Sequence, residues 1–133
     1  MNKTKVLIAE DNTDSQQLLR TILESEGFIV TTASDGEKAI DILREIKPDI
    51  LVTDLLLPTV SGGDLIRHVR STAELSQIPI VVISAYGDHY ESEALAVGAN
   101  IVLKKPLDSD LLINTLNQFK PPFGGERIRA GQI

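Results

Sequence analysis

The protein has 133 residues, which is enough for one compact domain and too few for two ordinary ones. It contains no cysteine, which excludes disulfides, thiolate chemistry and metal sites built on cysteine. The net charge of −6 and the lack of any cluster of Lys and Arg argue against nucleic-acid binding, because neutralisation of phosphates normally supplies that affinity.

The first predicted strand is an apolar run at residues 6–9. This run is too short for the core of a signal peptide or for a membrane span, so we expect a cytoplasmic protein without membrane contact. Leu and Ile then recur at helical spacing over residues 18–23, and Gly27 is a plausible end for this helix. A second apolar run at residues 28–33 contains two threonines, which suits a strand at the edge of a sheet.

The middle of the chain continues this alternation. Ser34 and Glu37 predict a capping box at the start of a helix whose apolar positions fall within residues 39–46. A third apolar run at residues 50–53 is continuous and rich in β-branched side chains, which predicts a strand covered on both faces. A third helical pattern follows at residues 65–69.

Four further elements complete the pattern. They are a strand at residues 80–83, a short helix at residues 94–97 that ends at Gly98, a strand at residues 101–103 and a helix at residues 111–116 that begins at Asp108 or Ser109. No periodicity remains after this helix. We therefore expect a domain at residues 1–119 and a tail or linker stub at residues 120–133, with no effector domain following in this chain.

Five repeats of strand and helix predict an α/β domain in which helices cover both faces of a five-stranded parallel sheet. Among the doubly wound orders, 2-1-3-4-5 fits best because it places the polar second strand at an edge. Ligands of such sheets bind at the carboxyl ends of the strands, near the switch point between strands one and three.

Polar side chains follow four of these predicted strands. They are Glu10 and Asp11 after the first, Asp54 after the third, Ser84 after the fourth and Lys105 after the fifth. Three carboxylates at one edge repel one another, so a hard divalent cation is their natural partner. Magnesium suits a site with few carboxylates and open positions, where it can bridge to phosphate.

The remaining groups suit phosphoryl transfer. Lys105 supplies a compact positive charge for one phosphoryl oxygen, and the Ser84 hydroxyl can donate to another. Asp54 is then the acceptor, a carboxylate nucleophile that gives an aspartyl phosphate. Each residue also has an ordinary interpretation as a helix cap or a solvated side chain, but their coincidence at one edge favours a function.

Four segments of the chain resemble the receiver domains of two-component response regulators. They are residues 6–12, residues 54–58 with Gly62 following, residues 82–85, and residues 98–99 leading to Lys105 and Pro106. The resemblance covers about residues 4–119 and implies a flavodoxin-like, CheY-like fold. It also implies that Asp54 is the phospho-acceptor and that Glu10, Asp11, Asp54 and the backbone carbonyl of Leu56 hold Mg²⁺.

Further roles follow from this resemblance. Ser84 corresponds to the hydroxyl that switches on phosphorylation, and Lys105 senses the phosphate and precedes a cis peptide bond to Pro106. The phosphodonor is expected to be a phosphohistidine on a sensor histidine kinase or a histidine phosphotransfer domain. Asp14, Ser15 and Leu18 form a plausible docking surface for it.

The sequence departs from the family at two places. Val102 occupies the switch position where many receivers carry Tyr or Phe, so we expect activation through shifts of loops and backbone instead. Leu56 and Tyr86 occupy the positions that tune the lifetime of the phosphoryl group. Neither side chain is well suited to orient an attacking water, so we expect slow self-dephosphorylation.

Several alternatives belong to other classes of protein. A haloacid-dehalogenase type of enzyme needs a second Asp where this chain has Leu56, so we expect no conventional enzymatic turnover. A flavodoxin-like cofactor binder needs a loop that cradles phosphate, and the loop after the first strand is acidic. A receiver-like protein-interaction module that is never phosphorylated usually lacks the acceptor or the acidic pair.

The sequence leaves the assembly and the pathway open. We expect a monomer or a weak homodimer, the latter through the face from the fourth to the fifth helix, and a downstream protein target. A complete single-domain regulator, a phosphorelay intermediate and a receiver belonging to a longer protein all remain compatible with the chain.

Overall fold

The structure is a computed structural model that describes residues 3–85 and 88–121. Tyr86, one of the two predicted lifetime-tuning residues, lies outside the described residues. So do residues 122–133, which make up most of the predicted tail.

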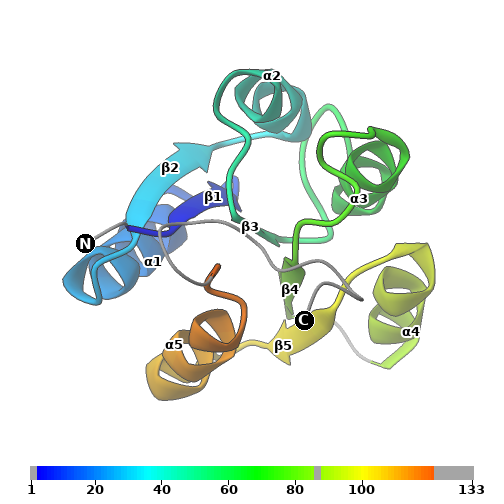
Figure 1. The fold of residues 1–133 in the computed structure, drawn as a ribbon. Coiled ribbons are helices and arrows are strands. Elements are labelled where there is room, and N and C mark those ends of the chain that lie inside the picture. Colours follow the sequence, from blue (N-terminus) through cyan, green and yellow to red (C-terminus); the bar gives the residue numbers. More distant parts are fainter. Residues whose placement is uncertain (1–2, 86–87, 122–133) are drawn as a thin grey trace.

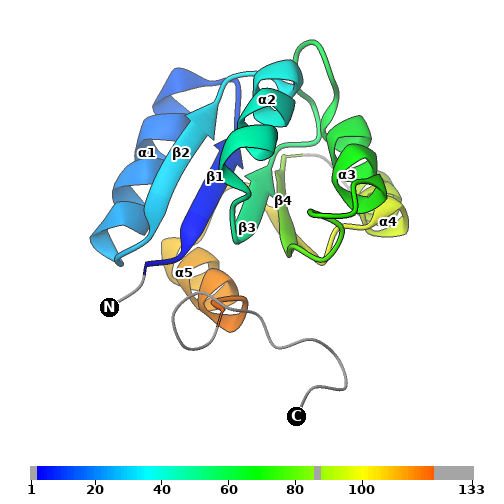
Figure 2. The same cartoon turned by 45° about the horizontal axis from the view of Figure 1, so that its top comes forward.

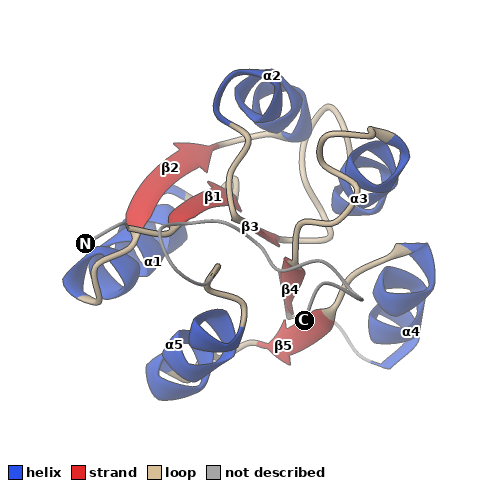
Figure 3. Ribbon diagram, viewed as in Figure 1, coloured by secondary structure: helices blue, strands red, loops and turns tan. Residues whose placement is uncertain are grey.

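Strands and helices alternate along the described chain (Figures 1 and 3). The elements are β1 (Lys5–Ala9), α1 (Thr13–Ser25), β2 (Ile29–Ala33), α2 (Gly36–Ile46), β3 (Ile50–Thr53), α3 (Gly62–Ser71), β4 (Ile80–Ser84), α4 (Asp88–Val97), β5 (Ile101–Lys104) and α5 (Ser109–Gln118). All pairs of neighbouring strands are parallel, and the sheet has the order β2-β1-β3-β4-β5. The predicted fold class and strand order are confirmed.

Helices cover both faces of the sheet, with α1 and α5 on one face and α2, α3 and α4 on the other (Figures 1 and 2). Alternate residues of each strand therefore enter different cores. Leu7 and Ala9 of β1 pack in the core beneath α2, α3 and α4, whereas Val6 and Ile8 pack beneath α1 and α5. Burial on both faces explains why the central strands are continuous apolar runs.

Three strands extend one residue further than the sequence pattern predicts. β1 begins at Lys5, β4 includes Ser84 and β5 includes Lys104, and the last two residues are paired in register at the end of the ladder. β2 begins at Ile29, one residue later than expected, because the Phe28 N–H donates to the Leu23 carbonyl at the end of α1. Among the described helices, none is both long enough and apolar enough to cross a membrane.

The predicted capping box of α2 is wrong by one residue. Asp35, not Ser34, is the N-cap, and its Oδ1 accepts a hydrogen bond of 2.8 Å from the Lys38 N–H. Glu37 falls in the first turn, and its N–H donates to Thr59 Oγ1 at 3.0 Å. The predicted box does not form because Thr59, in the loop after β3, accepts the hydrogen bond from the Glu37 N–H. The sequence around α2 gives no sign of this distant partner.

The other helix ends follow ordinary rules. Asn12 caps α1 by accepting from the Ser15 N–H at 2.9 Å, so the preceding acids Glu10 and Asp11 are not its N-cap. Asp108, one of the two predicted residues, caps α5. Gly27, with φ +89°, follows the end of α1 as expected.

Candidate functional site

The carboxyl ends of β1 and β3 lie side by side at the centre of the sheet. Main-chain pairing continues one residue past each strand, since the Glu10 N–H donates to Ala33 and the Asp54 N–H donates to Ala9, both at 3.0 Å. This pairing fixes the direction in which Glu10 and Asp54 leave the sheet. The two acids therefore meet at the predicted switch point.

Three acids form a cluster at this point. Oxygen atoms of Glu10, Asp11 and Asp54 lie within 4.8 Å of one another. Glu10 is only 3% exposed, Asp54 is half-buried and Asp11 is exposed. Clusters of exposed acids are common, but a buried carboxylate is costly unless it is paired, so the position of Glu10 requires a partner.

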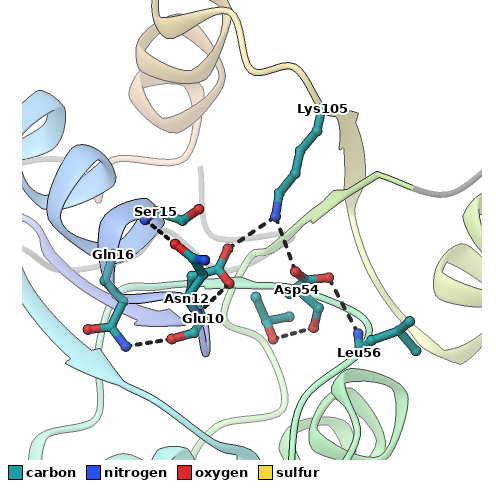
Figure 4. Close-up of polar contacts among 8 residues, drawn as sticks. Glu10, Asn12, Ser15, Gln16, Asp54, Leu56 and Lys105 are labelled. Carbon is teal, nitrogen blue, oxygen red and sulfur yellow. Dashed lines mark hydrogen bonds and ion pairs between the residues drawn. The ribbon is translucent and has the colours of Figure 1, made fainter.

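Lys105 provides that partner (Figure 4). Its Nζ lies 3.2 Å from Glu10 Oε1 and 3.3 Å from Asp54 Oδ2, so one ammonium is shared by acids from two strands. Burial lowers the pKa of Lys105, but the negative charges of Asp54 and Glu10 and their hydrogen bonds outweigh this effect, and the pKa is raised above its ordinary value. Lys105 is thus held in its charged form.

The second oxygen of Glu10 is also occupied. Glu10 Oε2 accepts from the Asn12 N–H at 3.1 Å, and the Gln16 side chain donates to the Glu10 carbonyl (Figure 4). Gln16 was not predicted as part of the site. Its N–H donates to the Asn12 carbonyl one turn earlier, which brings its side chain back over the end of β1.

The main chain around Asp54 is tightly packed. Its carbonyl accepts from Thr53 Oγ1 at 2.8 Å, and its Oδ1 lies 3.4 Å from the Leu56 nitrogen. A Cβ at Gly62 would lie 2.1 Å from the Asp54 carbonyl oxygen. Glycine is therefore required at residue 62 for α3 to begin this close to Asp54.

Ser84 and Lys105 are joined through the main chain. Ser84 is 1% exposed, and its carbonyl accepts from the Lys105 N–H at 2.9 Å. The peptide bond between Lys105 and Pro106 is cis, which is the geometry that the resemblance implies. The structure thus brings Ser84 to the same edge as the acids.

Three further predicted positions differ in their burial. Val102 is partly buried and packs against the core beneath α2, α3 and α4. Leu56 is 46% exposed, and its main-chain nitrogen lies 3.4 Å from Asp54 Oδ1. Leu18, on the predicted docking surface of α1, is 58% exposed.

These observations define a doubly wound α/β protein whose sheet carries an acidic site beside a charged lysine, chemistry that suits a divalent cation and a phosphoryl group. The sequence profile described as "Response regulator receiver domain" matches residues 6–117. The chain therefore belongs to the response regulator receiver domain family, a signalling family rather than one of conventional enzymes.

Similar sequences place this domain in several kinds of protein. The chain is 35% identical over 115 residues to a 14.6 kDa protein of Leptolyngbya boryana, covering 86% of this chain and 88% of that protein. It is 36% identical over 134 residues to the phosphate regulon transcriptional regulatory protein PhoB of Rhizobium meliloti, covering 97% of this chain but 59% of PhoB. A match to the sensor histidine kinase TmoS of Ectopseudomonas mendocina, at 33% identity, spans 96% of this chain and 13% of that kinase.

Solved structures share the fold closely. The chemotaxis response regulator CheY4 of Vibrio cholerae has a TM-score of 0.84 at 27% identity, covering 89% of this chain and 99% of CheY4. The receiver domain of a Pseudomonas aeruginosa sensor histidine kinase, solved with magnesium coordinated in its active-site cleft, has a TM-score of 0.82 at 27% identity, covering 88% and 97% of the two chains.

Proposed function

We propose that the protein accepts a phosphoryl group on Asp54 from a phosphohistidine of a sensor histidine kinase or a histidine phosphotransfer domain. The reaction depends on Mg²⁺, and the modified protein signals to a downstream protein target in a two-component system or phosphorelay. The observation that carries this proposal is the Lys105 ammonium, which lies 3.2 Å from Glu10 and 3.3 Å from Asp54. This geometry places beside Asp54 a cation that can turn to a phosphoryl oxygen.

The donor set fits Mg²⁺. The cluster offers carboxylate oxygens only, which are the ligands that a hard cation prefers. Glu10, Asp11 and Asp54 would hold the ion, and the Leu56 carbonyl joins them by the resemblance. When bound, Mg²⁺ supplies positive charge that offsets the repulsion among the acids and the phosphoryl oxygens.

The protein's own groups carry the transfer. A carboxylate oxygen of Asp54 forms a bond to phosphorus while the bond from phosphorus to the histidine nitrogen breaks, and the released imidazole takes a proton from water. The Lys105 ammonium then pairs with a phosphoryl oxygen, and the Ser84 hydroxyl donates to another. Ser84 is coupled to Lys105 through the main-chain hydrogen bond at the end of β4.

Changes in this region supply the signal. With Val102 at the switch position, we infer that loops and backbone at the carboxyl edge move instead of an aromatic ring. We further propose that residues 1–119 form the receiver unit, that residues 120–133 are a tail or linker, and that the protein acts in the cytoplasm as a monomer or weak homodimer.

Incubation with acetyl phosphate and Mg²⁺, followed by intact mass spectrometry, tests the proposal. We expect the protein to gain the mass of one phosphoryl group, the gain to require Mg²⁺, and Asp54→Asn to abolish it. Asp64→Asn, an exposed acid in the first turn of α3, is the matched control and keeps the gain. A wild-type protein that never gains this mass is instead a receiver-like interaction module.

A further inference from the structure

Thr59 has an unusual backbone conformation in the loop that follows the acceptor. Its φ is +66°, in the left-handed region that β-branched residues rarely adopt. The Val60 N–H also donates to the Pro58 carbonyl at 2.8 Å, which closes a three-residue turn across Thr59. Turns of this kind with a positive central φ are rare and strained. Gly or Asn would adopt this conformation with less strain, so the presence of threonine indicates that its side chain has a role.

The Thr59 hydroxyl joins this loop to the start of α2. Thr59 Oγ1 accepts from the Glu37 N–H at 3.0 Å and donates to Asp35 Oδ1 at 3.3 Å. The Pro58 carbonyl accepts from the Gly36 N–H at 3.1 Å. The first two N–H groups of α2 are thus satisfied by residues 58 and 59, from a loop more than twenty residues away in sequence.

The loop and the start of α2 are also in close backbone contact. A Cβ at Gly36 would lie 1.9 Å from the Val60 carbonyl oxygen, so the two backbones touch without room for a side chain. At its other end the loop is held by the Gly62 N–H, which donates to the Leu55 carbonyl at 2.8 Å. The segment of residues 54–61, here named the acceptor loop, is therefore fixed both beside Asp54 and at α2.

We propose that Thr59 is a positioning residue for the phosphoryl site. Its hydroxyl fastens the acceptor loop to α2 and so holds Asp54 and Leu56 in the arrangement that binds the divalent cation. The inference rests on the proposed function, because it concerns the same site. By this inference, the backbone strain at Thr59 is tolerated because the hydroxyl contact keeps the site in one precise arrangement.

Three variants separate positioning from simple stabilisation. Thr59→Val removes the hydroxyl and keeps the branched shape, Thr59→Ser keeps the hydroxyl, and Thr59→Gly removes the hydroxyl while relieving the strain. Ile50→Val is the control for stability, because it removes one methylene from a fully buried side chain at the other end of β3 from Asp54.

The measurements are the dissociation constant for Mg²⁺ by calorimetry, the melting temperature, and the rate of phosphorylation by acetyl phosphate. We expect Thr59→Val and Thr59→Gly to bind Mg²⁺ roughly tenfold more weakly, the size of effect seen when groups supporting a metal ligand are removed. Thr59→Ser should bind as wild type does. Ile50→Val should melt at a lower temperature with unchanged Mg²⁺ affinity.

Thr59→Gly gives the sharpest outcome, because relief of the backbone strain offsets part of the lost cap. Its melting temperature should therefore fall less than that of Thr59→Val while its Mg²⁺ affinity falls as much. If Thr59→Val and Thr59→Gly bind Mg²⁺ as wild type does, Thr59 only caps α2 and the inference is overturned. If wild type itself neither binds Mg²⁺ nor gains a phosphoryl group, the proposed function fails first, and the comparison with wild type distinguishes the two failures.

Discussion

The Nζ atom of Lys105 lies 3.3 Å from Oδ2 of Asp54, although the two residues are 51 positions apart in the sequence. The same atom reaches Glu10, so a single ammonium neutralises part of two acidic charges. The lysine thus has two roles in the resting protein: it stabilises the buried Glu10 carboxylate, and it occupies the space beside Asp54.

Lys105→Met should separate these roles. Loss of the ammonium leaves Glu10 without its cation, so the free energy of unfolding without Mg²⁺ should fall by about 1–3 kcal/mol. Mg²⁺ should bind more tightly, because a competing positive charge is gone, while phosphorylation should slow. Chemical denaturation, calorimetry and mass spectrometry measure the three effects. Lys104→Met, which removes an exposed lysine paired with Glu91 at 3.6 Å, should leave all three near wild type.

Mg²⁺ should stabilise the fold through the acidic cluster. A ligand that binds only the folded protein adds about 2.7 kcal/mol at a concentration 100 times its dissociation constant, so the melting temperature should rise on titration. Glu10→Gln and Asp11→Asn should each reduce this rise, whereas Asp41→Asn, on the exposed face of α2, should not. A rise that persists in both cluster variants would place the ion elsewhere.

Gly62→Ala should damage the site directly. The added Cβ would lie 2.1 Å from the Asp54 carbonyl oxygen, so the acceptor loop must shift, and both stability and phosphorylation should fall. Gly63→Ala is the matched control, since its Cβ would meet nothing closer than 3.9 Å. That control should gain about 0.5–1 kcal/mol, as Gly to Ala changes in helices do. Equal phosphorylation rates in the two variants would contradict the close packing.

Arg70→Lys should destabilise the protein by about 2–3 kcal/mol, because lysine cannot reproduce the planar set of donors. Arg70 donates to the carbonyls of Ser76, Ile78 and Gly98 at 2.7–3.0 Å, and to Asn100 Oδ1 at 2.8 Å. Arg67→Lys is the matched control, since Arg67 makes an exposed ion pair within its own helix. Urea denaturation should show that this change alters the free energy of unfolding by less than about 0.5 kcal/mol.

The phosphoryl group should be long-lived. Leu56 is 46% exposed beside Asp54 and has no polar atom with which to orient a water molecule. Loss of acyl phosphate, followed after the donor is removed, should therefore take much longer than seconds, and Leu56→Asn should hasten it severalfold. A wild-type half-life of seconds would show that other groups direct the water.

The sequence predicted what depends on local pattern and on fold rules. Runs of β-branched residues indicated the central strands, and the order of a doubly wound sheet then brought Glu10, Asp54 and Lys105 to one edge. Contacts between distant loops were not predictable. Nothing near Asp35 indicates that Thr59 completes the cap of α2, because that contact depends on how two loops meet in space.

The start of the predicted capping box shows the limit most clearly. Ser34 and Glu37 have the right spacing, but the Glu37 N–H is taken by Thr59 and the cap moves to Asp35. Gln16 was missed for a similar reason, since a glutamine on a polar helix carries no signal that its amide turns back to Glu10. Local rules cannot rank such competing partners.

The burial of β1, β3 and β4 on both faces has a consequence for how receiver domains distinguish between partners. Apart from Lys5, every residue of these three strands is buried, so nearly all of the sheet's centre is hidden from other molecules. Discrimination between one kinase or target and another must therefore reside on the outer sides of helices and in loops. Proteins of many distinct pathways can therefore share the same buried sheet and the same chemistry while their exposed side chains differ.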